Sequence, residues 1–167
     1  MVQKGKTVVY RDKICKIVDI VEKYKDNEDY YFLEPASDPS LHIKVPVSLA
    51  KDHIHPLMSK AEIEILIQRI PHIECVSINQ SSRGAEYESL LNKGSHECIV
   101  QIIKTAYLRR QERSDRHQKP NEHDKRYFRQ AEQRLYGEIA ASLGIGYDEA
   151  KEYVESKVLA ATANLAL

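Results

Sequence analysis

The sequence predicts an α+β protein in which a small twisted β-barrel is followed by a compact domain of five helices. Runs of β-branched and aromatic residues, separated by turn residues, fill the first third of the chain. From Ser59 onward the apolar residues recur every three or four positions, which is typical of helices packed on one face. We therefore place the domains at residues 1–57 and 58–167, in a chain whose 42% hydrophobic and 30% charged residues are typical of globular proteins.

Four short strands are expected in the first third of the chain, at residues 6–10, 14–21, 29–34 and 41–45. Polar turn residues at 25–28 separate the second strand from the third. Pro46 ends the fourth strand, because proline lacks the N–H group that a strand ladder requires. Four or five short strands within about 55 residues predict a small twisted barrel.

Five helices are expected after the strands, at residues 60–70, 83–92, 96–113, 122–143 and 148–159. Ser59 and Glu62 fit a capping box at the start of the first helix, and Pro71 ends it. Asn121 caps the long fourth helix and Gly144 stops it, since glycine adopts the left-handed conformation that ends many helices. Apolar side chains expected to face the core of this domain include Ile103, Tyr107, Phe128 and Val158, which recur at helical spacing.

Composition excludes several classes of protein. The 25 basic and 25 acidic residues give a formal net charge of zero, so a charged disordered tail is not expected. No apolar run approaches the roughly 18 residues of a membrane helix, and the start of the chain lacks the apolar stretch of a secretion signal. We therefore expect a cytoplasmic protein. The three cysteines, Cys15, Cys75 and Cys98, form no CxxC pair and are expected to pack as small buried apolar residues.

No residue pattern indicates catalysis. The chain has neither a glycine-rich phosphate loop nor a GxSxG motif. His53 and His55 flank one residue, but no cysteine or carboxylate at ligand spacing supports a metal site there. Asp148 and Glu149 are typical of acids that complement a helix N-terminus. We expect no enzymatic activity, no metal and no cofactor.

Basic residues are concentrated in one segment of this neutral chain. Residues 104–134 hold ten Lys or Arg against five Asp or Glu, a net charge of +5, whereas residues 135–167 hold two against five, a net charge of −3. Two interpretations remain open for the basic segment. It is either a solvated helix face with intrahelical ion pairs, or a surface that binds nucleic-acid phosphates.

The order of several segments resembles a known family. The segments KTVVY, ICKIVDI, DYYFL and LHIKVPVSLA resemble the N-terminal module of the CarD/CdnL family of bacterial transcription regulators. The same module occurs as the RNA polymerase interaction domain of transcription-repair coupling factors. The segments IIKTAYLRRQER and DKRYFRQAEQRLYGEIAASLGI resemble paired helices of the family's C-terminal domain. The resemblance extends from Gly5 to about Val158.

The resemblance implies a fold, two partners and a function. It implies that the N-terminal module is an SH3-like or Tudor-like barrel that adds its sheet to the β subunit of RNA polymerase. The helical domain is expected to contact promoter DNA at the upstream edge of the melted region, largely independently of sequence. Such a regulator modulates the stability of the open complex. We expect a monomer, associated with the nucleoid and not with a membrane.

The resemblance also implies contact residues. The polymerase-binding residues that it implies are Lys44 and, in the hairpin after the long strand, Lys23 or Lys25. For DNA it implies Arg83 in the short helix, and Lys125 and Arg126 at the start of the long helix. Arg129 joins these two by spacing, because the three residues lie within about one helical turn and so can follow a phosphate backbone.

One departure from the family concerns a tryptophan that the family inserts beside the minor groove. This chain has no Trp, and the matching position falls near Val76, with Ile78 as the alternative. An aliphatic side chain offers less stacking than a flat ring, so Val76 is expected either to be a weaker wedge or to anchor the loop. The missing Trp favours an alternative function, a polymerase-binding protein–protein adaptor without DNA contact. The basic segment opposes that alternative.

Overall fold

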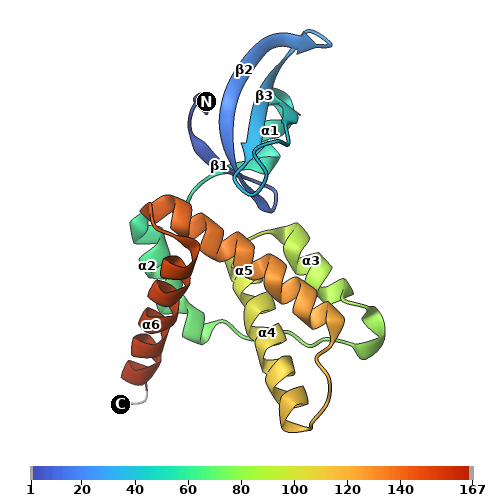
Figure 1. Ribbon diagram of the computed structural model, residues 1–167, viewed down its shortest axis with the longest axis vertical. Helices are drawn as coiled ribbons and strands as arrows, with labels where there is room; N and C mark the ends of the chain where they lie inside the picture. Colours follow the sequence, from blue (N-terminus) through green and yellow to red (C-terminus); the bar gives the residue numbers. More distant parts are fainter. Residues whose placement is uncertain (1, 166–167) are drawn as a thin grey trace. The chain divides into compact units, whose positions relative to one another are not determined.

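The computed structural model describes the backbone of residues 2–165 and the side chains of residues 2–162. It is an α+β protein that divides into two compact units, Met1–Met58 and Ser59–Leu167 (Figure 1). The division falls within one residue of the boundary expected from the change in apolar spacing. We describe each unit by itself.

A five-stranded antiparallel sheet forms the N-terminal unit, with the strand order β4-β3-β2-β1-β5. The strands are β1 (Thr7–Tyr10), β2 (Lys13–Lys25), β3 (Glu28–Pro35), β4 (Ile43–Pro46) and β5 (Ile54–Pro56). Strands β4 and β5 are the two edges and do not pair with each other, so the sheet is open and the predicted closed barrel is not confirmed. The predicted role of Pro46 is confirmed, since β4 ends there.

A short helix, α1 (Val47–His53), connects β4 to β5 and packs against the sheet. The described residues thus contain six α-helices where the sequence predicted five. Less than two turns of helix give too few residues for an apolar period to be recognised, which explains why α1 was missed. Alternate residues of β2 and β3 face the core below α1, among them Cys15, Ile17, Tyr31 and Leu33.

Strand β2 continues four residues beyond its predicted end. It pairs with β3 up to Lys25, and the turn at Asp26 and Asn27 has positive φ at both residues, 53° and 57°. That geometry suits the right-handed twist of a two-residue hairpin. The pairing shifts between Val21 and Lys25, and Lys23 adopts a φ of 48° within this bulge. Glu22, Lys23 and Lys25 interrupt the apolar alternation, so a prediction based on that alternation ended the strand at Val21.

Five helices form the second unit. They are α2 (Lys60–Arg69), α3 (Ala85–Lys93), α4 (His96–Asp115), α5 (Glu122–Leu143) and α6 (Tyr147–Leu165), with short 3-10 turns at η1 (Ile70–His72) and η2 (Gln80–Ser82). Their caps confirm the predicted starts of α2, α4 and α5, whereas α3 begins two residues later than predicted and α6 one residue earlier. The Ser59 hydroxyl accepts from the Glu62 amide at 3.2 Å and the Glu62 carboxylate accepts from the Ser59 amide at 2.7 Å, as a capping box requires. Asn121 Oδ1 accepts from two amides of the first turn of α5.

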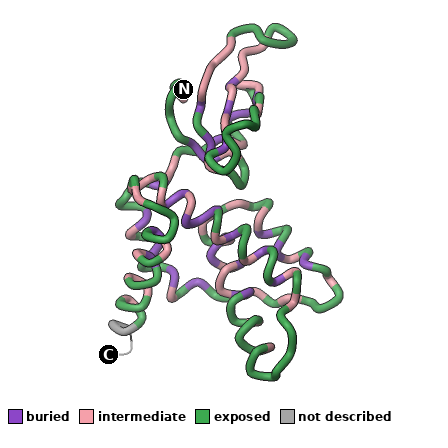
Figure 2. Tube along the Cα trace, in the orientation of Figure 1, coloured by how far each residue is buried: buried purple, intermediate pink, exposed green. Residues whose placement is uncertain are grey.

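Helix α5 lies against both α4 and α6, and buried segments recur along the facing sides of the helices (Figure 2). The buried apolar side chains of this core include Ile63, Ile67, Ile99, Ile102, Ala131, Leu135, Ile139, Ala150 and Val154. Four residues predicted to face this core depart from that expectation: Tyr107 is 60% exposed, and Ile103, Phe128 and Val158 are only half-buried. Among the described residues, no helix combines the length and apolar character needed to cross a membrane.

The cysteines occupy three different environments. Cys15 is fully buried in the sheet, Cys98 is half-buried, and Cys75 is exposed in the irregular segment after η1. The expectation that all three are buried is therefore wrong for Cys75, because the segment around it runs over the surface. Burial raises the pKa of the Cys15 thiol to about 11.

We predict that a maleimide at neutral pH labels Cys75 rapidly and leaves Cys15 unlabelled until the N-terminal unit unfolds. The thiolate is the reactive form, and both burial and the raised pKa of Cys15 suppress it. Mass spectrometry of labelled peptides along a urea titration measures this order. The Cys75→Ser variant should lose the fast labelling. Equal rates at Cys15 and Cys75 in the folded protein would contradict the structure of the sheet.

Candidate functional site

A partly exposed cluster of aromatic rings lies beside Lys44 on the N-terminal sheet. The rings of Tyr24 and Tyr30 lie 5.3 Å apart, and those of Tyr24 and Phe32 lie 5.1 Å apart, both edge to face. The ammonium of Lys44 lies 4.9 Å from the centre of the Tyr24 ring and 5.3 Å from that of Phe32. It also donates a hydrogen bond of 2.6 Å to the Tyr24 hydroxyl. We call Tyr24, Tyr30, Phe32 and Lys44 the aromatic–lysine cluster.

Strand register and the bulge in β2 assemble this cluster. Phe32 and Lys44 are direct partners in the β3–β4 ladder, so their side chains share one face. Tyr24 follows Lys23, whose positive φ breaks the alternation of β2 and whose amide donates to Asp29 Oδ1 at 2.9 Å. A bulge re-aims the side chains beside it. The bulge therefore lies directly before Tyr24, whose hydroxyl accepts the hydrogen bond from Lys44, 20 residues away in the chain.

The cluster joins the residues that the sequence predicted for polymerase binding. Lys44 lies exposed on the edge strand β4, and Lys23 and Lys25 flank Tyr24 at the exposed end of the hairpin. The structure therefore brings the hairpin and β4 together through Tyr24, which is 43% exposed. Sequence reasoning missed Tyr24, because its neighbours in the chain are lysines and its aromatic partners lie on another strand.

The predicted basic residues of the helical unit lie on the exposed side of the first turns of α5. Lys125, Arg126 and Arg129 are all exposed, and Lys125 and Arg129 are four residues apart on one face. Arg126 stacks on its neighbour Tyr127, with the guanidinium carbon 4.7 Å from the ring centre, and donates to the Tyr127 hydroxyl at 2.9 Å. The Tyr127 hydroxyl in turn donates to Glu88 of α3 at 2.9 Å.

A tight turn brings Gly84, the residue after Arg83, against the same tyrosine. Arg83 and Gly84 both have positive φ, 53° and 86°, so Arg83 precedes α3. The prediction that Arg83 belongs to this helix is therefore wrong. Gly84 lies directly against Tyr127, because a Cβ at Gly84 would stand 2.6 Å from Tyr127 Cε2. Only glycine suits both the φ and the close approach. Arg83, Gly84, Glu88, Arg126 and Tyr127 form what we call the arginine–tyrosine cluster.

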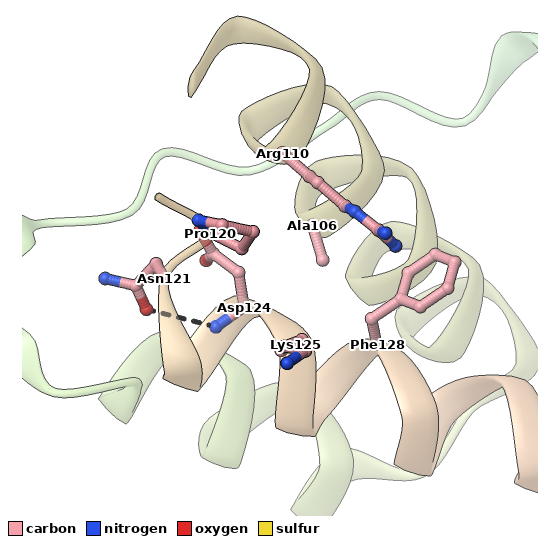
Figure 3. A pocket seen from close by; sticks show the side chains of 7 residues that line it. All are labelled: Ala106, Arg110, Pro120, Asn121, Asp124, Lys125 and Phe128. Carbon is pink, nitrogen blue, oxygen red and sulfur yellow. Dashed lines mark hydrogen bonds between the residues drawn. The ribbon is translucent and has the colours of Figure 1, made fainter. Parts of the chain in front are cut away.

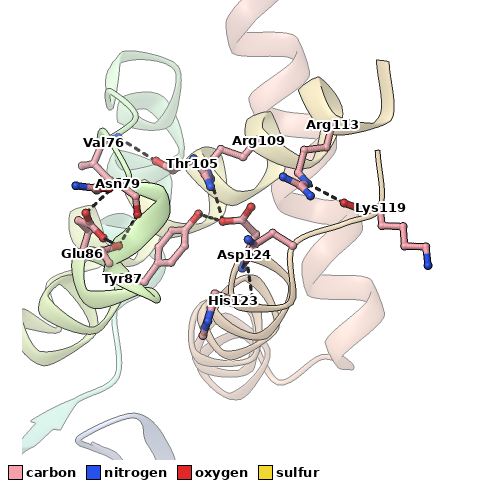
Figure 4. A network of polar contacts seen from close by, with 12 residues as sticks. Val76, Asn79, Glu86, Tyr87, Thr105, Arg109, Arg113, Lys119, His123 and Asp124 are labelled. Carbon is pink, nitrogen blue, oxygen red and sulfur yellow. Dashed lines mark hydrogen bonds and ion pairs between the residues drawn. The ribbon is translucent and has the colours of Figure 1, made fainter. Parts of the chain in front are cut away.

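Beneath this cluster, the buried carboxylate of Asp124 joins three helices (Figure 4). Asp124 Oδ1 accepts from the Tyr87 hydroxyl of α3 at 2.7 Å and from Arg109 Nε of α4 at 3.0 Å. Burial and the bond to Asp124 raise the pKa of Tyr87, which stays protonated as a donor. Among the described residues, Asp124 Oδ2 has no hydrogen-bond partner. The carboxylate therefore fixes the start of α5 against α3 and α4.

A small cavity adjoins Asp124, with a volume of about 10 Å³. The residues that line it are Ala106, Arg110, Pro120, Asn121, Asp124, Lys125 and Phe128 (Figure 3). This volume corresponds to about one water molecule, far below the roughly 300 Å³ of a small-molecule site. The cavity belongs to the packing of α4 on α5 and is not a substrate site.

Several charges of the basic segment are used inside the unit. Arg109 pairs with Asp124, and Arg134 pairs with the fully buried Glu138 at 2.7 Å. Lys104 donates to two backbone carbonyls of η1 and its flank, and Arg113 donates to the Lys119 carbonyl at 2.7 Å. The net charge of +5 therefore overstates the basic surface. The charge that remains on the surface is concentrated at the start of α5 and in the α4–α5 connection.

Val76 lies half-buried in the segment before η2, with its amide bonded to the buried Thr105 hydroxyl at 3.0 Å. Its side chain lines a shallow groove with Ala85 and Ser89 of α3. Of the two sequence interpretations, the bond to Thr105 supports the loop anchor for the backbone of Val76. Ile78, the alternative position, is also half-buried.

Comparison with known proteins finds no family model and no curated protein that matches this chain. Within the part of the chain that the structure describes, no three His, Cys, Asp or Glu side chains gather as metal ligands would. A functional proposal therefore depends on the geometry of the aromatic–lysine and arginine–tyrosine clusters, together with the resemblance of the segments that contribute them.

We predict that Gly84→Ala destabilises the helical unit more than Gly144→Ala. Both glycines have positive φ, 86° and 67°, so both substitutions strain the backbone. Only at Gly84 does the added methyl meet a ring, at 2.6 Å from Tyr127, whereas Gly144 has no atom within 4 Å. The collision should cost about 1–3 kcal/mol beyond the strain.

Urea unfolding followed by far-UV circular dichroism measures both variants, with Gly144→Ala as the matched control. Equal losses would show that the contact between Gly84 and Tyr127 does not constrain the turn that carries Arg83.

Proposed function

We propose that this chain is a transcription regulator of the CarD/CdnL type, whose N-terminal unit binds the β subunit of RNA polymerase and whose helical unit binds promoter DNA. Its effect is to change the stability of the open complex. One observation carries the proposal: Lys44 and Arg126, two of the contact residues implied by the resemblance, each lie against a tyrosine ring, Tyr24 in the N-terminal unit and Tyr127 in the helical unit. We assign the sheet and α1 to an SH3-like or Tudor-like module.

The N-terminal unit offers an edge strand with a side-chain anchor beside it. The outer edge of β4 carries backbone groups without a strand partner, and a partner strand binds such an edge by backbone hydrogen bonds. Aromatic residues and cations are favoured at the centres of interfaces. The aromatic–lysine cluster supplies both, and the positive charge of Lys44 suits an acidic partner surface.

The helical unit offers a surface suited to phosphates. Lys125 and Arg129 make no ion pair or hydrogen bond among the described residues, so their charges are available to a ligand. The arginine–tyrosine cluster presents Arg126 on the ring of Tyr127, and the exposed Arg83 precedes the glycine that packs against that ring. Contacts of this kind position DNA without reading its sequence. The proposed binding is therefore largely independent of sequence, with the polymerase selecting the promoter.

The adaptor without DNA contact is the second candidate function. The anchored amide of Val76 and the absence of Trp favour it, since no flat side chain is available to stack on an opened base step. Glu88 also places a negative charge beside Tyr127 and Arg126. Both candidates require polymerase binding, and they differ in whether the start of α5 contacts phosphates.

We predict that Lys44→Glu weakens binding to the polymerase β subunit by about 1–3 kcal/mol, because it opposes like charges at the interface. The fold should persist, since Lys44 is exposed and its contacts with Tyr24 and Phe32 are worth only about 0.5–1 kcal/mol at such a site. Fluorescence titration of a β fragment measures the affinity. Lys51→Glu, an exposed charge reversal on α1, is the control. A folded Lys44→Glu variant with wild-type affinity would refute this interface.

We predict that the double variant Lys125→Ala, Arg126→Ala lowers the slope of log affinity against log salt by about two, if each residue neutralises one phosphate. The measurement is the affinity of the polymerase–promoter complex for the protein over a salt series. Lys60→Ala with Lys93→Ala removes the same charge from exposed positions on α2 and α3 and should leave the slope unchanged. An unchanged slope in the α5 variant as well would favour the adaptor.

A further inference from the structure

The helical unit contains an open groove that neither cluster uses. It lies between α4 and α6, which both pack on α5, and its volume is about 780 Å³. Ile103 and Tyr107 line the α4 wall, Val158 and Leu159 line the α6 wall, and Leu135 of α5 contributes to the floor.

The walls of this groove carry apolar side chains that the unit itself leaves uncovered. Leu159 is 72% exposed and Tyr107 is 60% exposed. Phe128 and Val158 belong to the apolar stripes of their helices, yet both remain half-buried beside the groove. Helices bury such stripes against a neighbour, and large exposed apolar patches mark interaction surfaces. The stripes of α4 and α6 are therefore completed by something other than this unit.

The charged residues of the groove restrict which partner can fill it. Lys151 of α6 pairs with Glu132 of α5 at 3.1 Å, and Lys104 donates to backbone carbonyls. Arg110 on the α4 wall and Glu155 on the α6 wall are exposed and make no ion pair among the described residues. Opposite charges thus stand on opposite walls of one apolar groove.

We propose that a second copy of this chain fills the groove, so that α6 of each copy lies between α4 and α6 of the other. A two-fold interface uses the same patch on both copies and must be self-complementary. This patch meets that requirement, because each copy supplies an apolar ridge at Leu159 and an apolar groove to receive it. The two-fold axis also brings Arg110 of each copy to Glu155 of the other, which forms two ion pairs. A foreign helix of one charge sign would be attracted by one wall and repelled by the other.

The lengths of the helices suit this arrangement. Helices α4 and α6 contain 20 and 19 residues, which corresponds to about 30 Å each at 1.5 Å per residue. Two such pairs form a four-helix arrangement with extended side-by-side contact. The dimer replaces the monomer expected from the sequence, and it is independent of the function proposed above, because it uses neither cluster.

Analytical ultracentrifugation of the full chain, from about 1 μM to 1 mM, covers the range in which dimers of ordinary affinity dissociate. The wild-type protein should approach twice its monomer mass. Leu159→Glu should remain monomeric with an unchanged circular dichroism spectrum, since the side chain is exposed in the isolated unit.

Charge exchange tests the pairing itself. Arg110→Glu and Glu155→Arg should each weaken association by at least about tenfold, because each creates two like-charge contacts. The double variant should restore it. Glu112→Arg, an exposed reversal on the opposite side of α4, is the matched control and should leave association unchanged.

Two results would overturn the proposal. One is a wild-type chain that stays monomeric throughout this concentration range. If the wild-type chain nevertheless binds an apolar fluorescent probe and Leu159→Glu does not, the groove serves a different occupant. The other is a double charge exchange that fails to restore association.

Discussion

The buried Asp124 carboxylate is the constraint on which the helical unit depends. A carboxylate with 3% exposure is tolerated only when donors compensate for the water it has lost. Here one donor comes from α3, Tyr87, and one from α4, Arg109, while Asp124 itself lies in the first turn of α5. Removing one partner of a buried ion pair costs about 3–5 kcal/mol, a large fraction of the 5–15 kcal/mol that stabilises a typical domain. The bonds are directional, so they fix where the three helices meet.

That junction has consequences at the surface. Because Tyr87 holds α3 against the start of α5, the turn before α3 meets the ring of Tyr127, and only Gly84 leaves room for it. Gly84, the neighbour of Arg83, and Arg126 therefore both contact the ring of Tyr127. In the N-terminal sheet the constraint is different. There a bulge at Lys23 directly precedes Tyr24, which contacts Lys44. In both units a residue with positive φ lies at the cluster, Lys23 beside Tyr24 in the sheet and Gly84 against Tyr127 in the helical unit.

Buried charge also limits what net charge can indicate. Burial acts to raise the pKa of Glu138, but the hydrogen bond from His96 and the charge of Arg134 outweigh it and hold that pKa below its usual value. Glu138 therefore remains ionised inside the unit and neutralises an arginine that the sequence counts as basic surface. Several basic residues of the segment with a net charge of +5 are engaged in ion pairs and hydrogen bonds within the unit. The exposed part of this segment is smaller and lies at the start of α5.

The sequence by itself determined four of the five strands, the five helices after residue 58 and those helix ends that carry a cap or a glycine stop, because caps, glycine stops and apolar periods are local properties. Ser59, Asn121 and Gly144 mark helix ends through bonds to residues at most four positions away. It also named Lys44, Arg83 and Arg126 as candidate contact residues. Tertiary structure alone decided that the sheet stays open, that Tyr107 is exposed, and that Asp124 is buried. These outcomes depend on contacts between segments distant in the chain, and no local pattern records which side chain a distant helix or strand will bring beside another.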